Sequence, residues 1–192
     1  EEAWDDVSGA TAHSYGPTGL DTFFYQNSSL MDGVTIGLDY IPSDGADQIE
    51  SSTAATIKYT GIEGLTIGAG MGEDNGEGPT DADDVTAFNV TYAMDAVSVG
   101  YSSYEVDSNA SSSDTTLTAM GISYAVSDDL SVSLNSSTTE IEGSSDQDAM
   151  GVSASLVIGS MTLSANHNSV ENVGGTTGKD RSGYALGLSF AF

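Results

Sequence analysis

The chain has 192 residues, enough for one large all-β domain or two small ones. It carries 29 acidic and 3 basic residues, a formal net charge of -26, and this excludes nucleic acid as a partner because phosphate binding needs Lys and Arg. The absence of cysteine excludes disulfides and thiolate metal sites. No run of about 18 apolar residues occurs, so no transmembrane helix is predicted.

The chain opens with an acidic segment, residues 1–20, in which apolar and polar residues alternate poorly. From residue 21 onward, short segments alternate large apolar residues with small or polar ones, which is the period of a β-strand. These segments lie at 22–27, 34–40, 55–60, 65–71, 87–92, 97–102, 119–124, 130–135, 150–156, 161–166 and 183–192. We therefore predict about eleven strands in a single all-β domain over residues 1–192.

The two faces of the predicted strands differ in a way that favours a membrane barrel. One face of the last strand carries Tyr184, Leu186, Leu188, Phe190 and Phe192. The other face carries Gly, Ala and Ser. A large apolar face suits lipid, and a small polar face suits a water-filled lumen. The main charged residues within the strands, Asp39 and Lys58, both fall on the predicted lumen face.

The connections between the predicted strands alternate strictly between short and long. Short turns are predicted at 31–33, 61–64, 93–96, 127–129 and 159–160, and long connections at 42–52, 72–84, 107–114, 140–148 and 171–182. In an up-and-down barrel, this alternation places all long loops at one rim. Most acidic residues fall in the long connections, so that rim is expected to be anionic.

The sequence contains no recognisable catalytic set. His13 and His167 are the only histidines, and the glycines of residues 68–72 fit a strand better than a nucleotide-binding loop. Asp81, Asp83 and Asp84 could bind Ca²⁺, since hard cations need several carboxylate oxygens. Because no loop has the EF-hand spacing, solvated loop charge is the favoured interpretation of these acids.

Two stretches resemble Gram-negative outer-membrane porins of the general, trimeric kind. The last strand, with Phe192 at its end, is similar to the C-terminal assembly signal of that family. Residues 22–34 resemble the segment that follows the constriction loop in the family, with Gln26 where the family often has Arg. The resemblance implies the C-terminal portion of an antiparallel, up-and-down transmembrane β-barrel of about sixteen strands, left open in the chain as given.

The resemblance also implies a function: a non-enzymatic, water-filled channel in the bacterial outer membrane for small hydrophilic solutes and ions. Residues 1–20 would belong to the constriction loop, where Glu1, Glu2, Asp5 and Asp6 would line the pore; a frayed acidic terminus is an equally supported alternative. Carboxylates at the pore and the rim predict weak cation selectivity. The expected partners are outer-membrane lipid, the barrel-assembly machinery, further copies in a homotrimer, and small solutes and cations.

Two other architectures are open at this point. An acidic extracellular β-sandwich or β-solenoid that binds calcium or carbohydrate explains the charge, but not the alternating connections. A smaller complete barrel of about twelve strands would use residues 4–15 as an additional strand.

Overall fold

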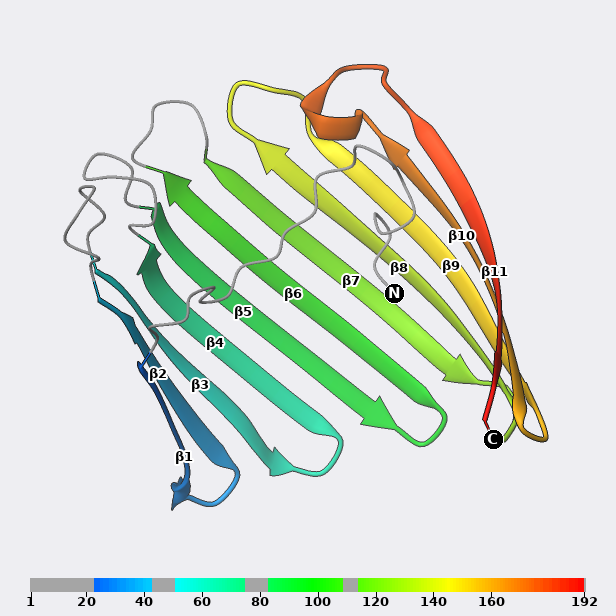
Figure 1. The fold of residues 1–192 in the computed structure, drawn as a ribbon, viewed down its shortest axis with the longest axis horizontal. Coiled ribbons are helices and arrows are strands. Elements are labelled where there is room, and N and C mark those ends of the chain that lie inside the picture. The colour runs from blue at the N-terminus through cyan, green and yellow to red at the C-terminus, as the bar shows by residue number, and fades with distance from the viewer. Residues whose placement is uncertain (1–22, 43–50, 75–82, 109–113, 192) are drawn as a thin grey trace. The chain divides into compact units, whose positions relative to one another are not determined.

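The computed structural model describes residues 23–42, 51–74, 83–108 and 114–191. These residues fall into two compact units. One contains residues 92–101 and 117–191, and the other contains the described parts of 23–91 and 102–116. Both are built from antiparallel strands (Figure 1). In the described part of the chain, no helix has the length and apolar character needed to cross a membrane.

The described residues form eleven strands that are hydrogen-bonded in sequence order in one sheet. Their bounds are β1 Phe23–Met31, β2 Val34–Ile41, β3 Ser52–Ile62, β4 Leu65–Asp74, β5 Asp83–Met94, β6 Val97–Ser108, β7 Thr115–Ala125, β8 Leu130–Ile141, β9 Gln147–Ile158, β10 Met161–Glu171 and β11 Arg181–Phe190. A short 3-10 helix, η1, spans Val173–Gly175. The predicted all-β antiparallel class and the predicted number of strands are confirmed. A sandwich would divide the strands between two sheets and a solenoid would pair them in parallel, so neither alternative fits.

The short turns lie where the sequence predicts them. Asp32-Gly33 joins β1 to β2, and Glu63-Gly64 joins β3 to β4. Gly33 and Gly64 each have a φ of 74°. Such two-residue hairpin turns need a positive φ, which glycine adopts without steric cost. The glycines therefore fix the connection and, with it, the antiparallel register.

In the set β1–β4, each strand pairs with its sequence neighbour. Tyr40 of β2 is opposite Phe23, and Lys58 of β3 is opposite Thr35. Gly68 of β4 in turn lies opposite Lys58. The register is regular except near the Asp32-Gly33 and Glu63-Gly64 turns, where it shifts between Asn27 and Met31 and between Tyr59 and Ile62.

In the set β8–β11, the pairing continues without a register shift. Leu134 of β8 is opposite Val152 of β9, which is opposite His167 of β10. His167 is opposite Tyr184 of β11. The end of β11 lies beside the turn between β9 and β10. The Ala191 amide donates a 2.8 Å hydrogen bond to the carbonyl of Ser160 in that turn. The last strand therefore ends at the short-turn side of this set, as predicted.

The strands extend further toward the long connections than predicted. The apolar alternation in β8 stops near Asn135, but the strand runs to Ile141, and Thr139 is paired with Gln147. Backbone hydrogen bonds carry these polar extensions, so they need no apolar face. As a correction, several acids expected in long loops lie in strands: Glu73, Asp74, Asp83, Asp84, Asp107, Glu140, Asp148 and Glu171.

Candidate pore wall

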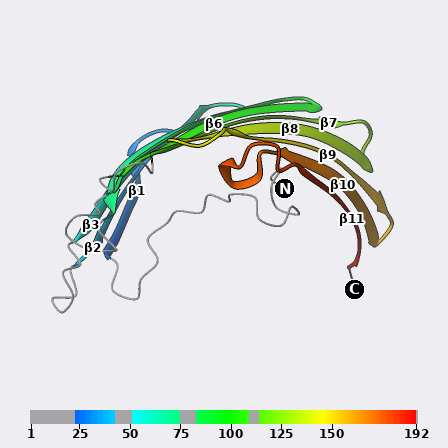
Figure 2. The ribbon, with the colours of Figure 1, turned by 90° about the horizontal axis from the view of Figure 1, so that it is seen from above.

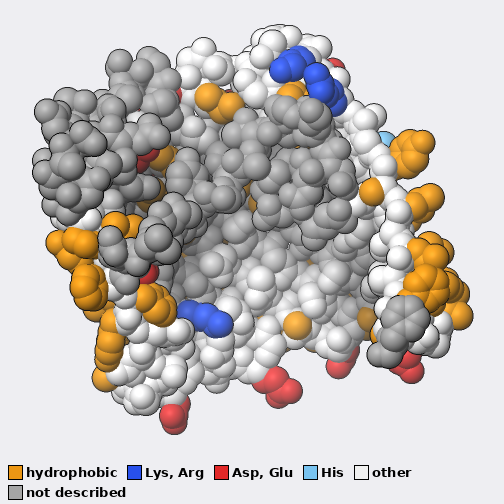
Figure 3. Space-filling model, in the orientation of Figure 1, with side chains coloured by type: hydrophobic (Ala, Val, Ile, Leu, Met, Phe, Trp, Pro, Cys, Tyr) orange, Lys and Arg blue, Asp and Glu red, His pale blue; other side chains and the backbone are white. Residues whose placement is uncertain are grey.

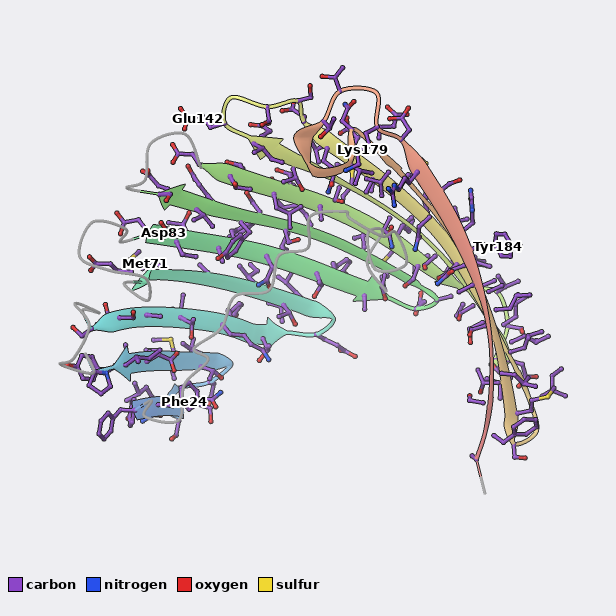
Figure 4. The ribbon with its side chains drawn as sticks, turned by 45° about the horizontal axis from the view of Figure 1, so that its top comes forward. Phe24, Met71, Asp83, Glu142, Lys179 and Tyr184 are labelled. Carbon is purple, nitrogen blue, oxygen red and sulfur yellow. The ribbon has the colours of Figure 1, made fainter. Side chains whose placement is uncertain are left out.

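The outer face of β8–β11 is apolar and exposed. We use "outer face" for the side that carries Leu134, Val152 and Leu186, and "inner face" for the opposite side. On the outer face, Leu134 is 46% exposed, Met150 55% and Leu186 75%. Hydrophobic side chains project from the edge of the molecule beside β11 (Figure 3), and Tyr184 points away from that strand (Figure 4). Such a surface is unfavourable in water and favourable in lipid.

The inner face of the same strands is largely polar, with Ala149 and Val170 as buried apolar exceptions, and it contains the least exposed side chains. Thr139 is 1% exposed, Gln147 2% and Asn168 3%. The Ser133 and Ser153 hydroxyls are hydrogen-bonded at 2.7 Å. Asn166 Oδ1 accepts a 2.9 Å bond from the Ala185 amide. The usual arrangement of a soluble protein, with apolar residues inside and polar residues outside, is thus inverted.

Gly151 lies at the centre of an inner-face row in which Asn135 and Asn168 are its partners on β8 and β10. A Cβ atom on Gly151 would lie 2.5 Å from Asn168 Oδ1 and 2.6 Å from Asn135 Oδ1. Both amide side chains therefore occupy the space above the glycine. The small residue in the strand allows longer polar side chains from its neighbours to meet on the inner face.

In β1–β4, we use "inner face" for the side opposite the exposed Leu38 and Tyr40, and this face carries the two predicted charged residues. Lys58 is in the row Thr35–Lys58–Gly68, and Asp39 is opposite Ala54. Cross-strand partners share a face, so both charges are on the same side of this set. They are not opposite each other in the register. Phe24, opposite Asp39, is also on this face, and its Cε2 atom would lie 3.7 Å from a Cβ atom on Gly37.

Other predicted site residues are only partly within the described structure. Glu1, Glu2, Asp5, Asp6, Asp81 and Phe192 lie outside the described residues, as does the proposed additional strand at 4–15. Tyr184, Leu186, Leu188 and Phe190 all lie on the exposed outer face of β11. Among the residues that are described, no three acidic or histidine side chains converge on a metal position. Asp83 and Asp84 are consecutive in β5, so their side chains point to opposite faces. Because Asp81 lies outside the described residues, calcium binding by Asp81, Asp83 and Asp84 stays a prediction.

The sequence interpretation missed one inner-face feature, the turn around η1. Residues 172–180, which we call the η1 loop, fold against the inner face of β9 and β10 (Figure 2). Val173 is completely buried and packs with Ala149 and Val170. The local signal was the series Asn172, Gly174, Gly175 and Gly178, in which every residue has a positive φ. Such residues permit a tight fold, but they do not indicate what it packs against.

The inverted faces and the sequential antiparallel strands define the class of outer-membrane β-barrel proteins. Residues 3–141 match the family model described as Gram-negative porin, and the chain belongs to that family. No curated protein matches the chain. Family membership confirms the predicted outer-membrane location, and this family consists of channels and not of enzymes.

Solved porins share the fold at low sequence identity. OmpF of Salmonella typhi, solved in complex with daunomycin, has a TM-score of 0.66 and 14% identity; 87% of this chain covers 60% of OmpF. OmpT of Vibrio cholerae expressed in the outer membrane has a TM-score of 0.58 and 16% identity, with 97% and 73% coverage. In-vitro folded OmpT gives 0.55 and 13%, with 88% and 63% coverage. The chain thus spans 60 to 73% of these porins.

Proposed function

We propose that the chain forms part of the wall of a water-filled channel for small hydrophilic solutes and ions, with a weak preference for cations. The inverted arrangement of β8–β11 carries this proposal. An exposed apolar outer face can contact lipid, while the partly exposed hydroxyl groups of Ser133 and Ser153 on the inner face can be wetted by water. Family membership supports the same function.

The preference for cations rests on charge. The chain has 29 acidic and 3 basic residues, and carboxylates at a pore mouth raise the local concentration of cations. On the inner face of β1–β4, Lys58 opposes this effect and Asp39 adds to it. We also propose that Glu1, Glu2, Asp5 and Asp6 line the narrow part of the channel.

Reversal potentials of the protein in planar bilayers test this function. In a KCl gradient at low ionic strength, we expect a reversal potential of the sign that indicates K⁺ permeation. The preference should weaken near 1 M KCl, because the Debye length then falls to about 3 Å. Anion preference, or the absence of channels, would contradict the proposal.

We further propose a homotrimer that assembles in outer-membrane lipid with the help of the barrel-assembly machinery. A structure of in-vitro folded Vibrio cholerae OmpT has been solved in its trimer form, and its fold resembles this chain. The exposed apolar outer face could contact both lipid and neighbouring subunits. An unheated gel should show a species of trimer size that boiling converts to monomer, and a monomer in both lanes would contradict this proposal.

A further inference from the structure

The η1 loop is anchored to the inner face by a buried apolar contact. Val173 is 0% exposed and packs with Ala149 of β9 and Val170 of β10, two inner-face residues. The views in Figures 1 and 2 agree that η1 lies against this side of β9 and β10. A loop that only extended into water from a strand end would have no reason to bury a valine there.

Polar contacts hold the same loop to the start of β9 and to the residues before it. The Gly174 amide donates a 2.9 Å hydrogen bond to Oε1 of Gln147, itself only 2% exposed. The Ser145 amide donates to the Gly175 carbonyl at 3.1 Å. The Ser145 and Thr177 hydroxyls are 2.6 Å apart. These contacts bind the loop to a different hairpin connection, residues 142–146, as well as to the wall.

Asn172 organises the fold of the loop itself. Its backbone amide donates to Asp180 Oδ1 at 3.1 Å, and its Nδ2 group donates to the Asp146 carbonyl at 3.0 Å. Its Oδ1 atom accepts from the Gly178 amide at 2.9 Å. Asn172 adopts a φ of 51°, and Asn tolerates this left-handed conformation better than most residues. The Asn172 backbone thus joins the two ends of the loop, and the Asn172 side chain holds the loop to the neighbouring connection.

We propose that the η1 loop is a docked part of the pore wall that narrows the lumen on the β9 side and limits the conductance. This inference rests on the proposed channel function, because it requires the inner face to line the lumen. The loop also carries the exposed Lys179 (Figure 4) and, next to it in sequence, the exposed Asp180. A pore conducts according to its diameter and its lining charges, so a loop docked on its wall affects both.

A loop deletion tests the inference in planar bilayers. Replacing residues 174–178 with Asn-Gly connects Val173 and Lys179, which share a 2.8 Å backbone hydrogen bond, through the two residues that a hairpin turn needs, and so deletes most of the loop. We expect the single-channel conductance to rise about 1.5-fold, because the lumen widens. Thr176→Ala, in the same loop, is the control and should conduct like the wild type. If the wild type conducts and the deletion leaves its conductance unchanged, this inference alone is wrong. If the wild type forms no channel, the proposed function is wrong as well.

A disulfide variant tests docking without shortening the loop, and covers the case in which the deletion variant does not assemble. The chain has no native cysteine, so Ser145→Cys with Thr177→Cys creates a single possible pair. We expect the disulfide to form in the folded protein and to leave the conductance unchanged, since the loop is already docked. Either single-cysteine variant controls for oxidation. A pair that does not oxidise, or a conductance that falls on oxidation, would show that the loop is undocked in the open channel.

Discussion

Gly151 allows Asn135 and Asn168 to meet over β9, and this close packing makes a specific prediction. Gly151→Ala would place a methyl group within 2.6 Å of both amide oxygens. We expect the folded protein to lose about 1 to 3 kcal/mol of stability, as in other overpacked sites. The midpoint of unfolding by urea or heat in detergent measures this loss.

Gly121→Ala is the matched control for this substitution. Gly121 of β7 is on the same face as Asn135. A Cβ atom there would lie 3.6 Å from Asn135 Cβ and from the Leu134 carbonyl oxygen, an ordinary van der Waals contact. Its unfolding midpoint should stay near that of the wild type. Equal losses in the two variants would mean that the effect comes from the loss of glycine and not from the crowded amides.

For Asn172, the sequence predicts a turn but not the residues that this side chain contacts. An Asn followed by glycines indicates a turn, and a long connection was predicted at this place. The partners of Asn172 include Asp146, which lies 26 positions away in sequence and in another connection. Nothing local in the sequence pairs these two residues. The loop could therefore be predicted, but its docking could not.

The alternating faces of single strands give a second prediction, which compares adjacent residues of β9. Val152 is on the outer face and Ser153 on the inner face. Val152→Arg should hinder insertion into vesicles, at a cost of about 2 to 4 kcal/mol if the residue is near the bilayer midplane. Ser153→Arg should insert normally, because its charge remains in water.

Folding into lipid vesicles, followed by the shift between heated and unheated gel bands, measures both variants. A defect in Ser153→Arg together with normal folding of Val152→Arg would reverse the assignment of the two faces. Equal folding of the two variants in vesicles would mean that this part of β9 lies outside the hydrocarbon region.

The same strands show how far an element can be predicted. The middle of β9 was predicted because Met150, Val152, Ala154 and Leu156 alternate with Gly and Ser. Its start at Gln147 was missed, as was the end of β8 at Ile141. There the polar residues of both strands carry no alternating apolar signal, and only the pairing of the two backbones defines the strand.

At the scale of the whole molecule, the exposed apolar row of β11 is expected to control assembly. Tyr184, Leu186, Leu188 and Phe190 form one exposed apolar row on β11, and Phe192 continues this row in sequence. Phe192→Ala, or its removal, should lower the amount of protein in the outer membrane, because the row resembles the family's assembly signal. Heat-modifiable protein in isolated membranes is the measurement.

Ala191→Ser is the control for that variant, since it changes the neighbouring residue of opposite parity and should assemble normally. Wild-type levels of folded protein after the loss of Phe192 would count against the assembly-signal interpretation. The family and the antiparallel order of the strands could both be predicted from the sequence, because alternation and connection length are properties of the whole chain. Which inner-face side chains meet depends on the register, which the sequence alone does not state.

The hydrogen-bonded hydroxyls of Ser133 and Ser153 have a consequence for permeating ions. In this pair, either oxygen can be the donor, and a hydroxyl group can turn its proton toward an anion or its lone pairs toward a cation. In the proposed channel, such a pair can contact ions of either sign. Replacing both serines with alanine should therefore reduce the hydration of the wall. The ratio of cation to anion permeability should not change, because the fixed charges determine it.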